Sequence, residues 1–394
     1  MDEALHPSRS LKHIINGRVY TPGRVFERGV VTIAGDKIVA VEEVVSPPDV
    51  TGAEVIDATG FHVIPGLIDL HIHGLSGFDA MQGQIAEIAA ELPRHGVTAF
   101  LASTIASPIE RLTEHLKEMA ATIAARPPGA RILGVHMEGP YLSPQRSAMM
   151  DPRLFRPFRW EEFEHLFAAS QGQVKMVTLA PEEGEALGGI PRLIERGVVP
   201  AIGHSDATFE QVAEAVRLGL AHASHTYNAM RGFHHRAPGT VGAVWHFDQI
   251  TAQVIADGVH VHPAAVALLL RLKGPERVAL ISDAAPIAGL PPGEYTWGGK
   301  QLILDGPSCH TPDGRLAGSS ALMDAGLRTL VDEVGLPLET ALVTATAVPA
   351  RVLSLNKGAL APGRDADVVL LDEALRPQLT MVEGEVVWRA LSVH

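Results

Sequence analysis

Between residues 63 and 285 the chain alternates short, apolar, β-branched runs with longer stretches that have helical periodicity. The runs lie at residues 63–70, 96–103, 131–138, 174–181, 198–205, 222–229, 250–258 and 277–285. Two of the stretches between them, PIERLTEHLKEMAATIAA and TFEQVAEAVRLG, place apolar residues at i, i+3 and i+4, as amphipathic helices do. Eight β/α units in series predict an α/β fold of the (β/α)8, or TIM-barrel, type.

The two ends of the chain have a different pattern, with short β-rich runs separated by Gly, Asn and Asp turn signals. Neither end is long enough to bury a sizeable core alone. We therefore expect residues 1–61 and 355–394 to form one small β-sandwich domain, and residues 62–354 to form the barrel domain. After the eighth run, residues 293–318 predict a hairpin over the barrel mouth, and helices should follow from about Ser320 to Leu353.

Composition excludes some classes of partner. The formal net charge is −13, whereas nonspecific nucleic-acid binding needs a basic surface. No apolar run approaches the roughly 20 residues of a membrane-spanning helix, and the polar N-terminal sequence lacks the apolar core of a signal peptide. The single cysteine, Cys309, rules out an intrachain disulfide and fits a reducing compartment. We expect a cytoplasmic protein with neither a nucleic-acid nor a membrane partner.

Side chains that bind metals recur where the predicted strands end. His71 and His73 close the first run, and residues i and i+2 of a strand share a face, so both should point into the barrel with Asp69 below them. Further candidates end or lie within runs three, five, six and eight: Glu138, His204, His225 and Asp283. One histidine at a strand end is most often an ordinary polar residue. Their coincidence at the end where TIM barrels carry active sites predicts a divalent transition-metal site.

Several segments are more specific than the His-x-His pair: PGLIDLHIHG, GVHMEGPYLSP, AIGHSDAT, HTYNAM, IADGVHVHP, SDAAPIAG, RLAGSS and GRDADVVLLD. Over nearly the whole chain they resemble the amidohydrolase superfamily of metal-dependent hydrolases, and within it the N-acetylglucosamine-6-phosphate deacetylase family. Many binuclear amidohydrolases use a carbamylated lysine at the end of strand four. Here Lys175 lies at the start of that run, and Glu138 can supply the carboxylate instead.

The resemblance implies the roles of the ligands. It implies a principal metal position formed by Glu138, His204 and His225, and a second formed by His71, His73, Glu138 and Asp283. One or two ions per subunit are implied, and Zn, Fe, Mn or Co would suit these ligands. Asp283 would also be the catalytic general base and acid, taking a proton from the attacking water and delivering it to the leaving amine. The implied products are glucosamine-6-phosphate and acetate.

The resemblance also implies a phosphate side of the site. The implied substrate-binding residues are Asn228, Ala229, Arg236, His260 and Leu316. Arginine suits a phosphate because its planar guanidinium makes two parallel, charge-assisted hydrogen bonds. Members of this family are commonly homodimers in which the neighbouring subunit lies near the phosphate, so a homodimer is expected here.

One segment departs from the family pattern. After EGPYL the family usually has a Lys-Gly-Ala-His-like segment whose histidine contacts the substrate, but here residues 147–150 are SAMM. Methionine cannot donate a hydrogen bond, so Arg146 or a histidine of the FHHR segment would have to compensate. This leaves another N-acyl substrate open, such as N-acetylgalactosamine-6-phosphate or an unphosphorylated acetamide. A non-catalytic relative is a third alternative, but it should have lost metal ligands.

Overall fold

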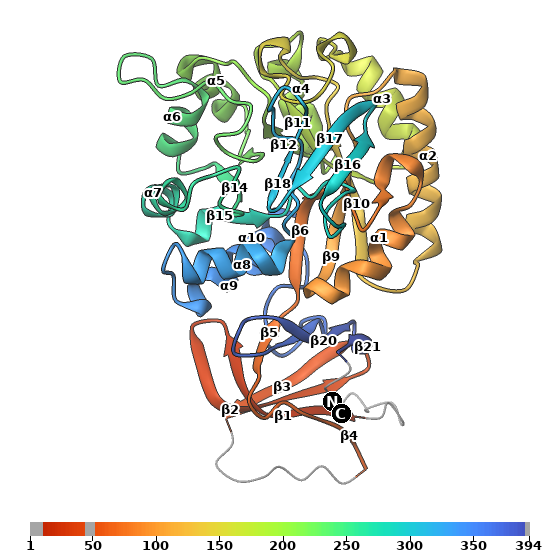
Figure 1. The fold of residues 1–394 in the computed structure, drawn as a ribbon, viewed down its shortest axis with the longest axis vertical. Coiled ribbons are helices and arrows are strands. Elements are labelled where there is room, and N and C mark those ends of the chain that lie inside the picture. The colour runs from red at the N-terminus through yellow and green to blue at the C-terminus, as the bar shows by residue number, and fades with distance from the viewer. Residues whose placement is uncertain (1–10, 44–51, 391–394) are drawn as a thin grey trace, which may run out of the picture.

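The computed structural model describes residues 11–43 and 52–390, which form a large barrel and a smaller β domain (Figure 1). The barrel strands follow one another in chain order: β6 (Leu67–Ile72), β9 (Val97–Ser103), β10 (Arg131–Glu138), β11 (Val174–Leu179), β12 (Val199–Ile202), β13 (His222–Ala223), β14 (Thr251–Ile255) and β15 (Val278–Ile281). All adjacent pairs are parallel, and nearly every strand residue is buried, as in sheets covered by helices. The predicted (β/α)8 barrel is confirmed.

The barrel closes where its first and last strands meet. The Asp283 amide donates a hydrogen bond to the His71 carbonyl at 2.9 Å, and Ile72 pairs with Ala284 in a parallel bridge. Two of the predicted ligand segments are therefore joined directly by backbone hydrogen bonds across this seam.

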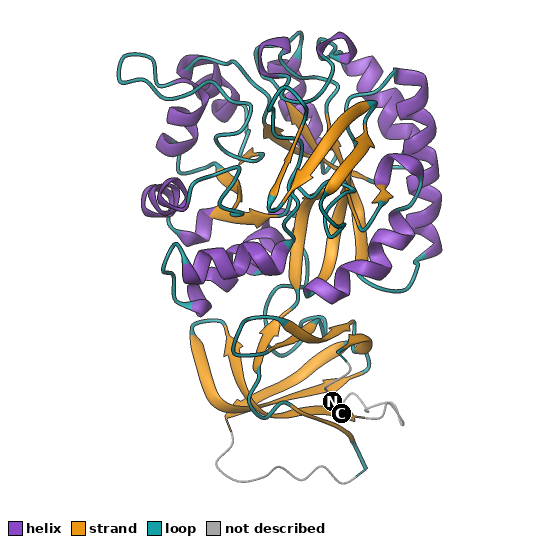
Figure 2. Cartoon of the chain, in the orientation of Figure 1, coloured by secondary structure: helices purple, strands orange, loops and turns teal. Residues whose placement is uncertain are grey.

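Helices surround the barrel, as Figure 2 shows. They are α1 (Ile85–Glu91), α2 (Ile109–Ala125), α3 (Trp160–Ala169), α4 (Ala186–Glu195), α5 (Phe209–Arg217), α6 (Gly239–His246), α7 (Pro263–Lys273), α8 (Met323–Asp332), α9 (Leu338–Ala345) and α10 (Ala347–Val352). Helix α2 buries Leu112, Leu116 and Met119, which lie on one face at helical spacing. The last three helices confirm the helical region expected after Ser320. In the part of the chain that the structure describes, no helix has both the length and the apolar character needed to cross a membrane.

The small domain uses both ends of the chain, as predicted. Its strands are β1 (Leu11–Thr21), β2 (Arg24–Ala34), β3 (Lys37–Glu43), β4 (Glu54–Asp57), β5 (His62–Pro65), β19 (Val368–Leu371), β20 (Pro377–Val382) and β21 (Glu385–Arg389). They enclose a core of their own that includes Ile14, Ile33, Val63, Leu370 and Met381. Residues 1–10, 44–51 and 391–394 of the predicted domain lie outside the described residues.

The chain crosses from the small domain to the barrel at Gly66, between β5 and β6. The predicted run 63–70 is thus split between two sheets. There is no room for a side chain at this crossing, because a Cβ on Gly66 would lie 2.1 Å from Thr98 Oγ1. The first barrel strand is therefore held tightly against its neighbour directly after it leaves the small domain.

The segment over the barrel mouth differs from the predicted hairpin. It is a three-stranded antiparallel sheet of β16 (Gly293–Trp297), β17 (Lys300–Asp305) and β18 (Ser308–His310). The third strand pairs with β17 and buries Cys309, which packs with Trp297, Met149 and Met150 in one apolar cluster. A second small element, the pair β7 (Gly74–Leu75) and β8 (Phe78–Asp79), directly follows His73.

The sixth predicted run is also shorter than expected. Its strand is only His222–Ala223, because the backbone then turns, with positive φ at His225, Tyr227 and Ala229. The sequence pattern of apolar, β-branched residues does not reveal this turn, because the positions with positive φ are not glycines.

Candidate metal centre and substrate cavity

The predicted metal ligands all come together at the carboxyl ends of the barrel strands. They are His71 and His73 from the end of β6, Glu138 from β10, His204 after β12, His225 after β13 and Asp283 after β15. All of them are buried or nearly so. Residues far apart in the sequence thus meet at one point on the barrel axis.

Three of these side chains converge around Glu138. Its Oε1 lies 2.9 Å from His225 Nε2 and 3.1 Å from His204 Nε2, and these two nitrogens are 3.1 Å apart. These are the three residues that the resemblance implies for a principal metal.

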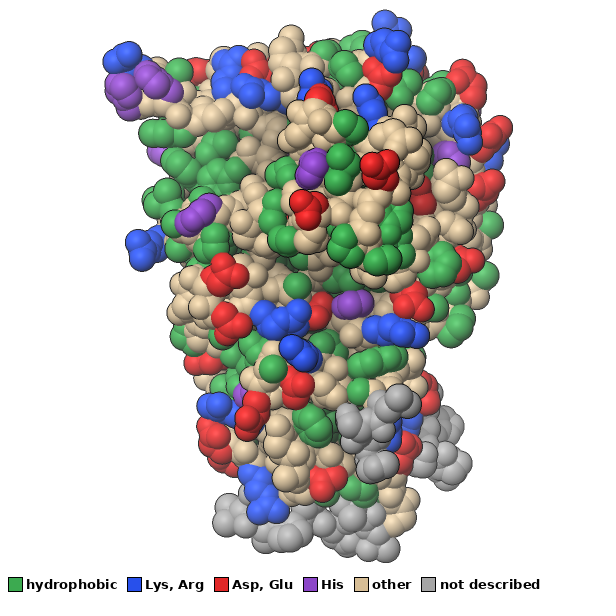
Figure 3. All heavy atoms as spheres, in the orientation of Figure 1, with side chains coloured by type: hydrophobic (Ala, Val, Ile, Leu, Met, Phe, Trp, Pro, Cys, Tyr) green, Lys and Arg blue, Asp and Glu red, His purple; other side chains and the backbone are tan. Residues whose placement is uncertain are grey.

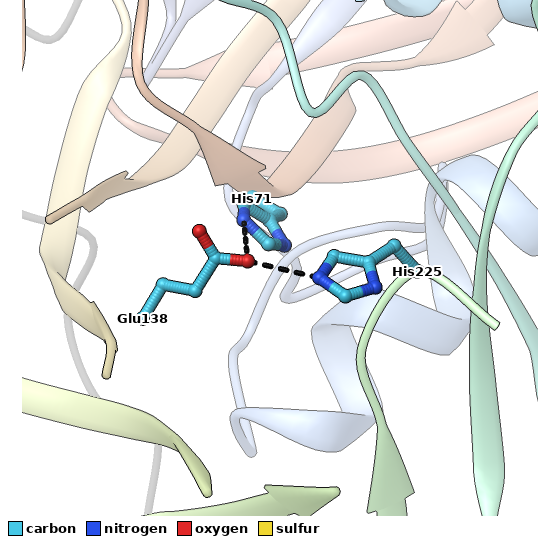
Figure 4. Close-up of side chains that lie close together, drawn as sticks. All are labelled: His71, Glu138 and His225. Carbon is cyan, nitrogen blue, oxygen red and sulfur yellow. Dashed lines mark hydrogen bonds and ion pairs between the residues drawn. The ribbon is translucent and has the colours of Figure 1, made fainter. Parts of the chain in front are cut away.

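The remaining ligands converge beside the first group. The Nε2 atoms of His71 and His73 are 3.2 Å apart, and Asp283 Oδ1 lies 3.3 Å from each. Glu138 borders this group too, with Oε1 3.4 Å from His71 Nε2 and Oε2 3.3 Å from His73 Nε2. Figure 4 shows the Glu138 carboxylate between His71 and His225. Each of two groups, His71 with Glu138 and His225, and His71 with His73 and Asp283, has ligand atoms close enough to hold one metal ion.

Hydrogen bonds at the far side of the rings show that the ligands fit a metal. His204 Nδ1–H donates to the Arg146 carbonyl at 2.8 Å, and His71 Nδ1–H donates to Gln253 Oε1 at 3.4 Å. Because carbonyl oxygens only accept, Nδ1 carries a proton in both rings, so Nε2 is the ring nitrogen that faces the cluster and can bind a metal in place of a proton. Nε2 atoms near 3 Å from one another repel unless a proton or a cation lies between them.

The charges in this cluster favour a cation. Burial would raise the pKa of Glu138, but His71 and the hydrogen-bonding rings of His204 and His225 hold it well below its ordinary value. Burial opposes a charge on His73, yet the carboxylates of Asp283 and Glu138 raise the pKa of its ring to about 10. The cluster thus attracts positive charge, which a divalent ion can supply.

The backbone is strained where three ligands leave their strands. His204, His225 and Asp283 have φ values of 45°, 26° and 48°, in the left-handed region that residues other than glycine rarely occupy. Such strain concentrates at functional sites. It also turns each side chain from the strand direction toward the barrel axis.

A layer of buried polar side chains supports the ligands from below. Asp69, which we expected to point inward, accepts hydrogen bonds from Ser282 Oγ at 2.5 Å and from the His71 amide at 3.2 Å. Gln253 links the His71 ring to the His225 amide, and its Nε2–H donates to His222 Nε2 at 3.0 Å. Sequence analysis missed Gln253, because an isolated glutamine in an apolar run carries no motif.

A cavity of about 260 Å³ opens above the ligands. Five ligands line it, and so do four of the five expected substrate residues: Asn228, Ala229, His260 and Leu316. It is also lined by residues that sequence analysis did not select, Ile105, Trp297 and Arg315. A larger concavity, of about 630 Å³, lies at the opposite end of the barrel among Lys175, His222 and Arg351. Because it contains none of the ligands, we place the site in the smaller cavity.

The fifth expected substrate residue, Arg236, does not line this cavity. It lies on an exposed loop between β13 and α6, where its Nη1 is 2.9 Å from His235 Nε2. Figure 1 shows this loop projecting from the barrel, and Figure 3 shows histidine and cationic side chains together at its tip. The FHHR histidines therefore do not replace the missing histidine within this chain.

The segment that departs from the family pattern lines the cavity with apolar side chains. Met149 and Met150 both face it and are largely buried. Arg146 does not compensate, because its guanidinium is bound by Asp206, with Nη2 to Oδ1 at 2.6 Å. Arg315 reaches the rim instead, where its Nη1 lies 3.4 Å from the Ala148 carbonyl.

His260 is held by an acid that sequence analysis did not select. Its Nδ1–H donates to Asp257 Oδ2 at 2.7 Å, and Ser319 Oγ donates to the same oxygen at 2.9 Å. Burial opposes a charge on His260, but the hydrogen bond and charge of Asp257 raise the pKa of the imidazole above its ordinary value. His260 is thus more cationic near neutral pH than a free histidine.

Comparison with known proteins shows the family of this chain. The family model described as "Amidohydrolase family" matches residues 62–387. The chain belongs to the amidohydrolase family. Among curated proteins, an N-acetylglucosamine-6-phosphate deacetylase of Lysinibacillus sphaericus is 37% identical over 85% of this chain and 88% of the relative. An N-acetylgalactosamine-6-phosphate deacetylase of Escherichia coli O157:H7 is 38% identical over 82% and 86%.

A solved structure has a similar fold over nearly the whole chain. The structure of N-acetyl-D-glucosamine-6-phosphate deacetylase from Mycobacterium smegmatis, in complex with N-acetyl-D-glucosamine-6-phosphate, is 33% identical to this amidohydrolase. It superposes with a TM-score of 0.90 over 96% of this chain and 99% of that chain. Barrel and small domain thus share one arrangement in both proteins.

Proposed function

We propose that this amidohydrolase is a metal-dependent N-acetylglucosamine-6-phosphate deacetylase. The observation that carries the proposal is the cluster of all six predicted ligands, with Asp283 facing the cavity that Asn228 and His260 also line. The similarity to deacetylases over most of the chain supports the substrate class. A non-catalytic role is disfavoured because no ligand has been replaced.

The metal is proposed to be one or two Zn, Fe, Mn or Co ions per subunit. Glu138, His204 and His225 would hold the principal ion, and His71 and His73 would join Glu138 and Asp283 around a second. When bound, such an ion acts as a Lewis acid toward the acetamide carbonyl and lowers the pKa of water at the site. Metal analysis of the purified protein tests both the identity and the number of ions.

Asp283 is proposed to move the proton. Burial would raise its pKa, but the charge of His71 and the hydrogen bond with His73 lower it, so the carboxylate is ionised and able to accept a proton from the attacking water. The same oxygen then delivers that proton to the nitrogen as the amide C–N bond breaks. The water supplies its oxygen to acetate, and the sugar leaves as a free amine.

The phosphate is proposed to bind at Asn228, Ala229 and His260, with Leu316 contributing shape near the acetyl group. Arg236 would reach this phosphate from the neighbouring subunit of a cytoplasmic homodimer, since within its own chain it lies on the projecting loop.

Subunit mixing tests the role of Arg236. Arg236→Ala and Asp283→Asn subunits are each expected to be impaired alone. A mixed dimer would contain one site with intact Asp283 and an Arg236 from its neighbour. Recovery of activity on mixing is expected if Arg236 acts between subunits, and absence of recovery would place it in its own site or in none.

The first experiment is acetate release by the metal-loaded protein. N-acetylglucosamine-6-phosphate, N-acetylgalactosamine-6-phosphate and unphosphorylated N-acetylglucosamine should be compared. We expect the first to be the best substrate, and a strong preference for it over the unphosphorylated sugar. The 38% identical relative keeps the galactosamine substrate as the second candidate, and higher kcat/KM for that sugar would replace the first.

A further inference from the structure

We propose that the cavity accepts N-acyl groups longer than acetyl, so that the substrates of this chain include N-propionyl and N-butyryl amino-sugar phosphates. The inference rests on the proposed deacetylase function and extends its substrate class. It is carried by the large apolar residues that line the cavity, which together we name the apolar wall. The apolar wall consists of Ile105, Met149, Met150, Trp297 and Leu316.

Distant segments build the apolar wall. The two methionines follow β10, while Trp297 ends β16 of the three-stranded sheet above the mouth. The turn after Trp297 closes over the other members, since a Cβ on Gly298 would lie 3.2 Å from Ile105 Cδ1 and 3.9 Å from Met149 Cε. The methionines are therefore packed into a built surface rather than lying loose in solvent.

This wall begins next to the reacting centre. The ring centroid of Trp297 is 5.4 Å from that of His73, one of the metal ligands. The scissile carbonyl must lie at the ligand cluster, of which Asp283 is a member, and the acyl chain begins one bond away from it. The acyl group therefore falls within reach of the wall.

The polar residues of the cavity suit the rest of the substrate. Asn228 and the partly cationic His260 can hydrogen-bond to a sugar phosphate, and the guanidinium of Arg315 lies at the rim with its side chain 62% exposed. None of the five side chains in the apolar wall carries a charge. An amide substrate with an apolar acyl tail and a polar phosphate would place the tail against apolar side chains and the phosphate against polar ones.

Methionine makes the wall adaptable. Its unbranched side chain has three rotatable bonds and fills irregular spaces, which is why methionine is common on surfaces that bind varied apolar groups. A pocket shaped tightly for acetyl would reject each extra methylene by about tenfold or more. Two adjacent methionines can instead move aside, and the added methylenes gain contact with Trp297.

The chemistry of the reaction is unchanged by a longer acyl chain. Water supplies oxygen to the acyl carbon, the C–N bond breaks, and the proton reaches the leaving nitrogen. The products are the corresponding carboxylic acid and the same amino-sugar phosphate. No further reactant is needed.

Kinetics with three substrates test the proposal. Release of glucosamine-6-phosphate, their common product, would be measured from the N-acetyl, N-propionyl and N-butyryl forms. The kcat/KM of the N-butyryl form is expected to be at least about one-tenth of that of the N-acetyl form. A lower value while the N-acetyl form is cleaved would overturn the inference and leave the proposed function intact.

Binding provides a second readout that does not need turnover. Calorimetry with the Asp283→Asn protein should give a Kd that tightens by up to about fourfold for each added methylene, as expected for apolar burial. If none of the three substrates were cleaved, the proposed function would fail, and so would the claim that the longer N-acyl sugars are substrates. The binding series would then still decide whether the cavity accepts the longer acyl groups. A Kd that weakens along the series would overturn it.

Matched substitutions locate the effect in the wall. Met149→Gln/Met150→Gln keeps the length of both side chains but adds polar amides, and should lower the butyryl-to-acetyl ratio of kcat/KM by about tenfold. Met149→Leu/Met150→Leu keeps the wall apolar and should preserve that ratio. An unchanged ratio in the glutamine protein would overturn the assignment of the wall.

Discussion

The barrel mouth and the small domain both bury charged side chains, but they balance these charges differently. In the small domain Lys357 Nζ lies 2.9 Å from Asp367 Oδ2 and 3.0 Å from Asp365 Oδ2, so the acids have a resident cation. At the mouth, the ion pairs of Glu138 and Asp283 among the described residues are all with histidines. Because histidine nitrogens are also metal ligands, this second cluster is the one that could take up a cation from outside the chain.

The comparison separates structural charge from functional charge. Glu383 extends the small-domain cluster and binds Arg131 at the start of β10, with Nη2 to Oε2 at 2.6 Å, so the cluster joins the two domains. Such a complete network leaves no site for a ligand. The incomplete cluster at the mouth faces a cavity. A residue in a cavity whose pKa is shifted by its surroundings is a candidate for a functional role.

The largest expected effect comes from breaking the mouth cluster at its acid. Asp283→Asn removes the proton acceptor, and kcat should fall by about 10²–10⁴-fold. Because the amide is nearly isosteric, the thermal midpoint of the metal-free protein should change little. Steady-state kinetics and differential scanning fluorimetry measure the two quantities, and Asp248→Asn, an exposed acid outside the site, is the control. Near-normal kcat in Asp283→Asn would assign the proton transfer elsewhere.

Breaking the small-domain cluster should lower stability and leave catalysis unchanged. Lys357→Met leaves Asp367 buried without its cation, and the free energy of unfolding should fall by about 3 kcal/mol. The kcat of the folded protein should be unchanged. Denaturant unfolding measures the loss. Arg153→Met, which removes an exposed ion pair with Asp151, is the control and should leave the midpoint unchanged.

Metal removal should affect only the incomplete cluster. With metal at about 100-fold above its Kd, chelation should lower the free energy of unfolding by about 2.7 kcal/mol, and added metal should restore it. Lys357→Met should respond to the chelator as the unmodified chain does. Thermal unfolding with and without chelator measures this, and insensitivity of both proteins would argue against a bound ion.

The smallest expected effect concerns the pH dependence of phosphate binding. Because Asp257 raises the pKa of His260, the imidazole stays cationic to a higher pH than a free histidine. KM for the phosphorylated substrate should rise as pH increases through this pKa. In Asp257→Asn that rise should begin at lower pH, while the unphosphorylated sugar shows no such shift. The test is to measure KM as a function of pH with both sugars, for the unmodified and the Asp257→Asn proteins. Identical profiles of the two proteins would show that His260 does not bind the phosphate.

The convergence of the candidate ligands could be predicted because strand geometry relates them. Two-residue spacing puts His71 and His73 on one face, and parallel strands bring their carboxyl ends together. The supporting residues could not be predicted in this way. Trp297 lies beside His73 because a small sheet packs over the barrel mouth, and no repeating pattern in the sequence predicts that packing. Gln253 is a single polar residue in an apolar run.

The positions of the expected substrate-binding residues were harder to predict where these residues lie on loops. Asn228 and His260 follow their strands closely and reach the cavity, whereas Arg236 lies on a projecting loop that no strand orients. Lys357 and Asp367 resemble an exposed charged segment in the sequence, because only the three-dimensional packing reveals their burial.

The seam between β6 and β15 has a consequence for the order of events during synthesis. His71 and His73 emerge from the ribosome early, but Asp283 belongs to the last barrel strand and is joined to His71 by a backbone hydrogen bond. The second metal position proposed above therefore cannot form until most of the chain has been translated. Its assembly is tied to the closure of the barrel.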